Sequence, residues 1–194
     1  TKFAIRRDVT KPKVAKTNPG ALVDTVWFGS AGTTFEVKWS VEDPGLSTVT
    51  INRDAVVASG TVYSRSVDMK NKTTDSTVWL VATDLAGNRS DTSKVVLRFD
   101  VVKPKVVKVD PVPALSVVPL GISPATYLVK WTATDANGIL SSTLNGTAGT
   151  AGASNGYSKI VDMSGKTGDS LIKLEAKDKA GNASTLVQFK IHRD

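Results

Sequence analysis

Six aspartates recur along the chain as two sets of three, and they are its clearest candidates for metal chemistry. The first set is Asp8, Asp43 and Asp84, and the second is Asp100, Asp135 and Asp178. Carboxylate oxygens suit Ca²⁺, which takes six to eight oxygen ligands. Three converging carboxylates repel one another unless a cation or hydrogen-bond donors compensate. Each set is therefore a candidate calcium site. The alternative is that each aspartate holds the amides of its own turn, in which case no cofactor is required.

The sequence offers few residues of the types that act in catalysis. A hydrolase or transferase needs a nucleophile, a base or paired carboxylates gathered in one site. The chain has no cysteine, and its single histidine, His192, is close to the last residue. A histidine without a positioned partner is more often a surface residue than a general base. We therefore expect no catalytic residues and a protein that is not an enzyme.

The aspartates recur because the sequence is duplicated. Val37-Lys38-Trp39 returns 92 positions later as Val129-Lys130-Trp131, and Val67-Asp68-Met69 returns 94 positions later as Val161-Asp162-Met163. A repeat of about 90 residues has the size of a small globular domain rather than of a solenoid unit. The pattern predicts two domains, residues 1–100 and 101–194. The junction is short and contains Pro104, so we expect an extended, semi-rigid arrangement.

Alternating apolar residues predict that both domains are built from strands. Phe35, Val37, Trp39 and Val41 alternate with polar residues, which is the period of a strand with one buried face. Further strands are expected at 47–51, 61–69, 78–82 and 94–99, and the second repeat has matching segments. A loop of small residues is expected at 145–156. About seven strands per repeat, without helical periodicity, predict an all-β chain of two stacked sandwiches.

The end of one strand in each repeat also carries a family resemblance. The segments are Ala82-Thr83-Asp84-Leu85-Ala86-Gly87-Asn88 and Ala176-Lys177-Asp178-Lys179-Ala180-Gly181-Asn182. They resemble the tandem bacterial immunoglobulin-like domains of surface adhesins, secreted enzymes and phage virion proteins. The resemblance implies immunoglobulin-like sandwiches. In a seven-strand sandwich the chain entry, the turn after the second strand and the turn before the last strand lie at one pole, so the three aspartates of each set are expected there. It also implies calcium, because some related arrays hold the ion at their junctions.

The four tryptophans separate into two kinds when the repeats are compared. Trp39 and Trp131 occupy equivalent inward positions and are expected in the cores. Trp27 and Trp79 have no aromatic counterpart, and Trp79 falls on the outward phase of its strand. An exposed indole is a stacking surface for a sugar or a partner protein. The alternative is that these two side chains pack under a loop or against a neighbouring domain.

The charge and hydropathy of the chain limit the classes of function that it could have. The net charge of +7 is spread over both halves, with 14 basic and 11 acidic residues in 1–100 and 11 and 7 in 101–194. Such a diffuse surface implies nonspecific attraction to acidic polymers and no specific nucleic-acid partner. No run approaches the roughly 18 apolar residues of a transmembrane helix.

Two functions remain open. The first is a non-catalytic structural and adhesion module, a spacer or stalk of a bacterial surface protein, located outside the cell. We expect it to be a piece of a longer chain whose other domains are its partners. The alternative is a module that binds carbohydrate or a cell-wall polyanion through Trp27, Trp79 and nearby basic residues, on a phage virion or beside a secreted enzyme. Its partner is then a surface glycan, a cell-wall polymer or a host protein.

Overall fold

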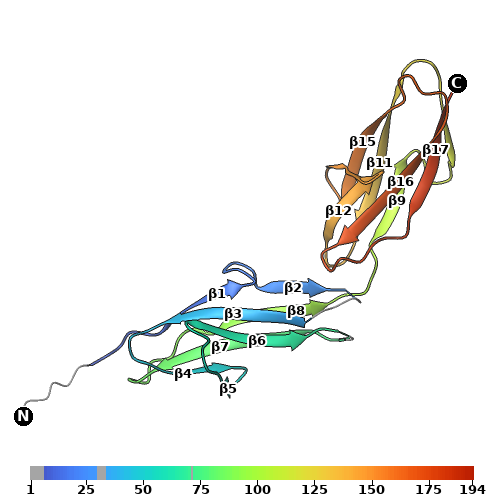
Figure 1. Ribbon diagram of the computed structural model, residues 1–194. Coiled ribbons are helices and arrows are strands. Elements are labelled where there is room, and N and C mark those ends of the chain that lie inside the picture. Colours follow the sequence, from blue (N-terminus) through green and yellow to red (C-terminus); the bar gives the residue numbers. More distant parts are fainter. Residues whose placement is uncertain (1–6, 30–33, 71) are drawn as a thin grey trace, which may run out of the picture. The chain divides into compact units, whose positions relative to one another are not determined.

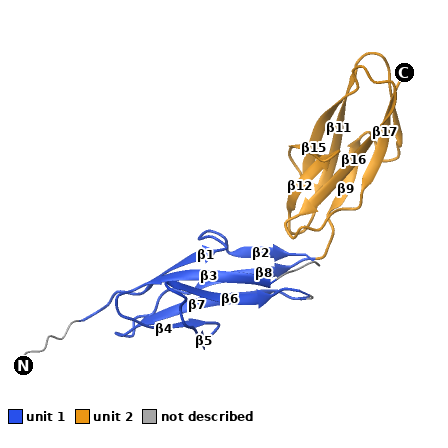
Figure 2. Cartoon of the chain, viewed as in Figure 1, with its two compact units in different colours: residues 1–100 blue, residues 101–194 orange. Residues whose placement is uncertain are grey.

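The computed structural model describes residues 7–29, 34–70 and 72–194. By internal contacts the chain separates after Asp100 into two compact units, residues 1–100 and 101–194 (Figure 2). Every element of regular structure in the described residues is a β-strand, so the prediction of an all-β chain is confirmed (Figure 1). Those residues include no helix of the length and apolar character that crossing a membrane requires.

The first unit is a sandwich of two sheets. One sheet has the order β1-β3-β6 and the other β2-β8-β7-β4-β5. The strands are β1 (Lys13–Asn18), β2 (Thr25–Phe28), β3 (Thr34–Glu42), β4 (Leu46–Ile51), β5 (Asp54–Ala55), β6 (Val62–Asp68), β7 (Ser76–Asp84) and β8 (Ser93–Phe99).

The second unit repeats this topology, with one additional short strand. Its sheets have the orders β14-β15-β11-β9 and β10-β17-β16-β12-β13. The strands are β9 (Lys105–Asp110), β10 (Val117–Leu120), β11 (Thr126–Thr134), β12 (Ile139–Leu144), β13 (Thr147–Ala148), β14 (Thr150–Ala151), β15 (Gly156–Asp162), β16 (Gly168–Asp178) and β17 (Val187–Arg193). The short strands β13 and β14 lie in the segment for which the sequence predicts only a loop.

Each unit has its own hydrophobic core. Alternation along β3 buries Val37 and Trp39, and the same alternation along β11 buries Val129 and Trp131. The core of the first unit contains only residues of that unit, and the core of the second unit likewise. The prediction that Trp39 and Trp131 are core residues is confirmed, because they are 0% and 1% exposed.

The first part of each repeat contributes to both of its sheets. In the first unit, β1 pairs antiparallel with β3, and the chain then crosses to the other sheet, where β2 pairs parallel with β8. In the second unit, β9 pairs with β11 and β10 pairs parallel with β17 in the same way. An early strand therefore lies beside the last strand of each unit, running in the same direction.

Candidate functional site

The turn after the penultimate long strand holds the beginning of each repeat in place. At the end of β16, Asp178 is fully buried, and its carboxylate accepts hydrogen bonds from the backbone N–H of Asn182 at 2.9 Å and from Asn182 Nδ2 at 2.8 Å. Asn182 Nδ2 also donates to the carbonyl of Val102 at 3.3 Å. Gly181 adopts a φ of 88°, which a glycine tolerates without strain. The Asp–Asn pair thus ties the incoming chain to the turn.

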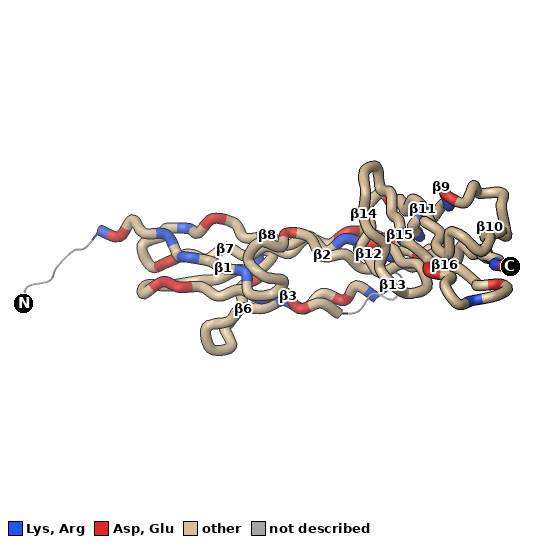
Figure 3. Tube along the Cα trace, turned by 90° about the horizontal axis from the view of Figure 1, so that it is seen from above, with Lys and Arg blue, Asp and Glu red and all other residues tan. Residues whose placement is uncertain are grey.

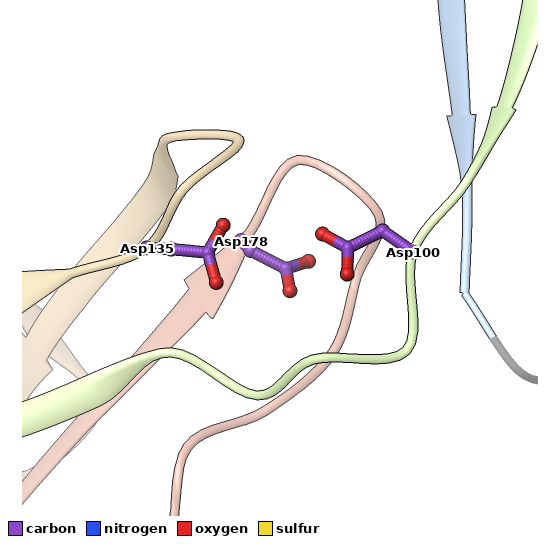
Figure 4. A group of neighbouring side chains, drawn as sticks. All are labelled: Asp100, Asp135 and Asp178. Atoms are coloured by element: carbon purple, nitrogen blue, oxygen red, sulfur yellow. The ribbon is translucent and has the colours of Figure 1, made fainter.

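Asp100, Asp135 and Asp178 form a carboxylate cluster. One oxygen from each lies within 4.8 Å of the others, and the three side chains point toward one another (Figure 4). Asp100 is 4% exposed and Asp178 0%, while Asp135 is half-buried and also accepts from Asn137 N–H at 2.8 Å. Ca²⁺–oxygen distances are about 2.3–2.6 Å, so two ligands of one ion lie at most about 5 Å apart. The cluster supplies three carboxylate oxygens, a donor type that Ca²⁺ binds, at a spacing that one ion can span.

The corresponding aspartates of the first unit are arranged differently. Among the residues with described positions, Asp8, Asp43 and Asp84 are not brought together in this way. Asp8 Oδ1 accepts from Thr10 N–H at 2.9 Å, and Asp43 Oδ1 accepts from Gly45 N–H at 2.7 Å. Each carboxylate therefore serves its own turn, as the alternative reading of the sequence expects.

A shift of two residues explains why Asp8 does not take the place of Asp100. In the first unit, Asn88 Nδ2 donates to the carbonyl of Asp8 itself at 3.2 Å. In the second unit the equivalent Asn182 bonds Val102, which is two residues after Asp100. Relative to its turn, the chain at the start of the first repeat is therefore displaced by two residues from the position that the sequence repeat implies.

Asp84 shows how such a turn affects a carboxylate. Its oxygens accept from the backbone N–H and the side-chain Nδ2 of Asn88, both at 2.8 Å. Burial of this aspartate acts to raise its pKa, but the hydrogen bonds from Asn88 and the turn outweigh burial and hold the pKa of Asp84 below its ordinary value. The turn therefore stabilises the ionised form.

Trp27 and Trp79 lie on one face of one sheet. Trp27 on β2 pairs with Arg98 on β8, and Trp79 on β7 pairs with Lys94 on the same β8. Val95 and Leu97, the alternate residues of β8, are buried in the core, so all four paired side chains belong to the outer face. Both indoles are half-buried. The Arg98 guanidinium lies over the Trp27 ring, 5.5 Å from its centroid.

Sequence reasoning singled out the two indoles and expected basic residues near them, but it did not identify Arg98 and Lys94. The alternation of Lys94, Val96 and Arg98 along a single strand was the signal available, because it places all three on one face. What the sequence could not supply was the identity of the neighbouring strands. Basic and acidic residues are otherwise interspersed in both units (Figure 3).

His192 lies on the surface, as the sequence predicts. Its side chain is 44% exposed; Nδ1 is 2.7 Å from Asp169 Oδ1, and Nε2 is 3.3 Å from Asp194 Oδ1. The hydrogen bond with Asp169 raises the pKa of His192 above its ordinary value. Two exposed carboxylates, those of Asp169 and Asp194, hold the ring.

Comparison with known proteins identifies the class of fold. No protein-family model matches the chain, and neither does any curated protein sequence. The fibronectin(III)-like modules of Clostridium thermocellum CbhA superpose with a TM-score of 0.57 at 18% identity, over 93% of this chain and 95% of that one. A chimeric titin Z1Z2 structure gives a TM-score of 0.41 at 10% identity, over 96% and 99% of the two chains. The sialic acid binding region of a Streptococcus sanguinis SK1 adhesin gives 0.33 at 11%, over 97% and 78%.

The match to the CbhA modules shows a fold and, at this identity, the fold alone. The chain is a tandem pair of β-sandwiches of the immunoglobulin and fibronectin(III)-like class. The prediction of two immunoglobulin-like sandwiches in tandem is confirmed.

Proposed function

We propose that this chain is a non-catalytic structural and adhesion module, a spacer or stalk within a longer bacterial surface protein outside the cell. The observation that supports it most is the parallel pairing of an early strand with the last strand in each unit. Two separate cores, each enclosed by its own sheets, are consistent with a module that works by shape.

The parallel pairs give each unit mechanical resistance. In the first unit the register runs from Thr25 opposite Val96 to Phe28 opposite Phe99, and Val96 N–H donates to the carbonyl of Asp24 at 2.8 Å. Tension on the two chain ends pulls β2 and β8 in opposite directions along a common axis. The hydrogen bonds between them are then strained together rather than one at a time, because they are evenly spaced along the pair. An early strand cannot detach without breaking several bonds at once.

The second unit has the same arrangement. Lys190 N–H donates to the carbonyl of Ser116 at 2.9 Å, which is the equivalent of the Val96–Asp24 bond. Both units are therefore built to bear tension through the same pair of strands. The repetition is what a spacer needs, since the weakest unit sets the force that the whole chain withstands.

Single-molecule stretching of the whole chain tests this proposal. We expect two separate unfolding events at high force. Val96→Pro removes one hydrogen bond of the first parallel pair and should lower the force of one event only, while Lys190→Pro should lower that of the other. Each unit is thus the control for its neighbour. Gradual extension at low force, or equal weakening of both events by one substitution, would refute the proposal.

Calcium is a second element of the proposal. We propose that Asp100, Asp135 and Asp178 bind Ca²⁺, which offsets the repulsion among three neighbouring carboxylates, two of them buried. The geometry of the first unit gives no comparable support for an ion at Asp8, Asp43 and Asp84. One ion per chain is the stoichiometry that the cluster supports.

A binding function is the second candidate, and one observation favours it. Trp27 and Trp79 share the outer face of one sheet, which is where a stacking surface for a sugar would have to be. A carbohydrate or cell-wall polymer is the ligand class that this surface suits. The same surface would serve on a virion or beside a secreted enzyme.

A further inference from the structure

The outer face of the sheet β2-β8-β7 combines aromatic and basic side chains in a regular pattern. We call it the basic aromatic face and define it by Trp27, Trp79, Lys94, Val96 and Arg98. Arg98 lies directly opposite Trp27, and Lys94 directly opposite Trp79. Between these two pairs, Val96 lies opposite Thr77 and Thr25. Each indole therefore has a cation beside it, and the strip between them is lined by small side chains.

The two indoles are far enough apart to contact different parts of an extended ligand. They are separated by four residues along the strands and by two strand spacings across the sheet, which correspond to about 13 Å and about 10 Å. A single sugar ring cannot reach both. A chain of several sugars, lying diagonally across β8, reaches both while passing Lys94 and Arg98.

Each cation of the face has an acidic neighbour and is still exposed. Arg98 is held over the Trp27 ring, and its Nε is 3.6 Å from Asp75 Oδ2, longer than a hydrogen bond. Asp24 lies near Lys94, but its closest partner is Lys16, which donates a hydrogen bond to it. Lys94 and Arg98 are both exposed. A guanidinium held on an aromatic ring presents its planar N–H groups in a fixed orientation, which suits carboxylate and sulfate groups.

The second unit provides an internal comparison. By strand register the counterparts of Trp27 and Arg98 are Pro119 and His192, and those of Trp79 and Lys94 are Lys173 and Gln188. All four positions differ. Some large core side chains are identical in the two units, with Trp39 matched by Trp131 and Met69 by Met163. The fold does not need the two aromatic–cation pairs, because the second unit forms the same sheet without them. Their joint presence in the first unit is therefore not a requirement of the fold.

We propose that the basic aromatic face binds one chain of an anionic polysaccharide. Sugar rings stack on Trp79 and Trp27, and the carboxylate or sulfate groups of the polymer pair with Lys94 and Arg98. This inference rests on the second candidate function above and adds to it the chemical class of the ligand and a stoichiometry of one site per chain.

The test measures dissociation constants of the whole chain for three probes: alginate, which carries carboxylates, heparin, which carries sulfates, and a neutral cellulose-derived oligosaccharide. The variants are Trp79→Lys and Lys94→Gln, each of which installs the residue found in the second unit. Lys173→Gln is the matched control, since it removes one charge from the equivalent sheet of the second unit. Circular dichroism confirms that each variant is folded.

We expect an anionic probe to bind, and Trp79→Lys and Lys94→Gln each to weaken it about tenfold, which corresponds to the loss of one anchoring contact. Lys173→Gln should bind as the parent does. Trp79→Lys is decisive because it adds a positive charge: general electrostatic attraction would make binding tighter, whereas loss of the stacking surface makes it weaker. Alginate and heparin then distinguish carboxylate from sulfate recognition.

Three results would overturn the inference. If Trp79→Lys binds an anionic probe as tightly as the parent or more tightly, the attraction is nonspecific and the face is not the site. If only the neutral probe binds, and depends on Trp79 but not on Lys94, the binding function stands and the anionic class is wrong. If no probe binds, the inference and the second candidate function both fail, while the structural proposal is unaffected.

Discussion

The indole N–H of Trp131 donates a hydrogen bond to the hydroxyl of Ser142, 2.8 Å away in the opposite sheet. In the first unit the equivalent Trp39 bonds Ser93 instead, at 3.0 Å. Ser142 and Ser93 are not equivalent positions. The register places Val49 where the second unit has Ser142, and Val187 where the first unit has Ser93. Each core satisfies its buried indole with one serine and fills the other position with valine.

This exchange predicts a compensating pair of substitutions. Ser142→Val should destabilise the second unit by about 1–3 kcal/mol, because it leaves a buried N–H without an acceptor. Adding Val187→Ser should recover much of the loss, since it supplies a hydroxyl at the position that serves Trp39 in the first unit. Chemical denaturation measures both free energies of unfolding. A double variant no more stable than Ser142→Val would show that the hydroxyl positions are not interchangeable.

The hydrogen bonds between Asp84 and Asn88 predict that the stability of the first unit falls at low pH. The pKa of Asp84 is lowered in the folded unit, so its contribution is present above the ordinary aspartate pKa and is lost as the pH falls through the lowered value. Asp84→Ala and Asn88→Ala should each destabilise the first unit at neutral pH. The double variant should be little worse than either, because both remove the same hydrogen bonds. Fully additive losses in thermal melts would argue against a shared interaction.

His192 should titrate above the ordinary histidine value of about 6.5. Its hydrogen bond with Asp169 raises the pKa, so the stability that it adds is fully present below the ordinary value and is lost as the pH rises through the raised one. Asp169 has a lowered pKa, mainly through its hydrogen bond with Lys190. Its contribution to stability is therefore lost only at acid pH. An NMR titration of the histidine ring measures the shift. Asp169→Asn should lower the pKa of His192, and an unchanged titration would contradict the assignment.

Calcium should stabilise the chain through the carboxylate cluster alone. Free Ca²⁺ at about a hundred times its dissociation constant adds about 2.7 kcal/mol to a folded state that binds one ion. We expect the rise in melting temperature to vanish in Asp135→Asn and to persist in Asp43→Asn, the matched substitution in the first unit. Chelation by EDTA should reverse it. Equal responses of the two variants, or none in the parent, would exclude the proposed site.

The sequence predicts the parts of the structure that local patterns determine. Alternation places Trp39 and Trp131 inward, and the structure confirms it. It does not determine which strands become neighbours, so the shared face of Trp27 and Trp79 emerges only from the pairing of β2, β8 and β7. Gly149, in the segment predicted as a loop, shows the same limit: a Cβ there would lie 2.6 Å from the Trp131 ring. The sequence shows that residue 149 is a glycine, but it does not show that the Trp131 ring lies beside it.

The aspartates show a further limit. The repeat matches Asp8 with Asp100, but the hydrogen bonds of Asn88 and Asn182 match Asp8 with Val102. A shift of two residues at the start of a repeat leaves the sequence pattern intact and moves a carboxylate away from its counterparts. Only the path of the chain distinguishes a carboxylate cluster from three separate turns.

Each repeat is a complete sandwich with its own core and its own strand pairing. Producing residues 1–100 and 101–194 as separate chains tests this most directly, by comparing their amide NMR spectra and unfolding transitions with those of the whole chain. We predict that each half gives dispersed resonances and one cooperative unfolding transition. A half that is unfolded alone would contradict the account.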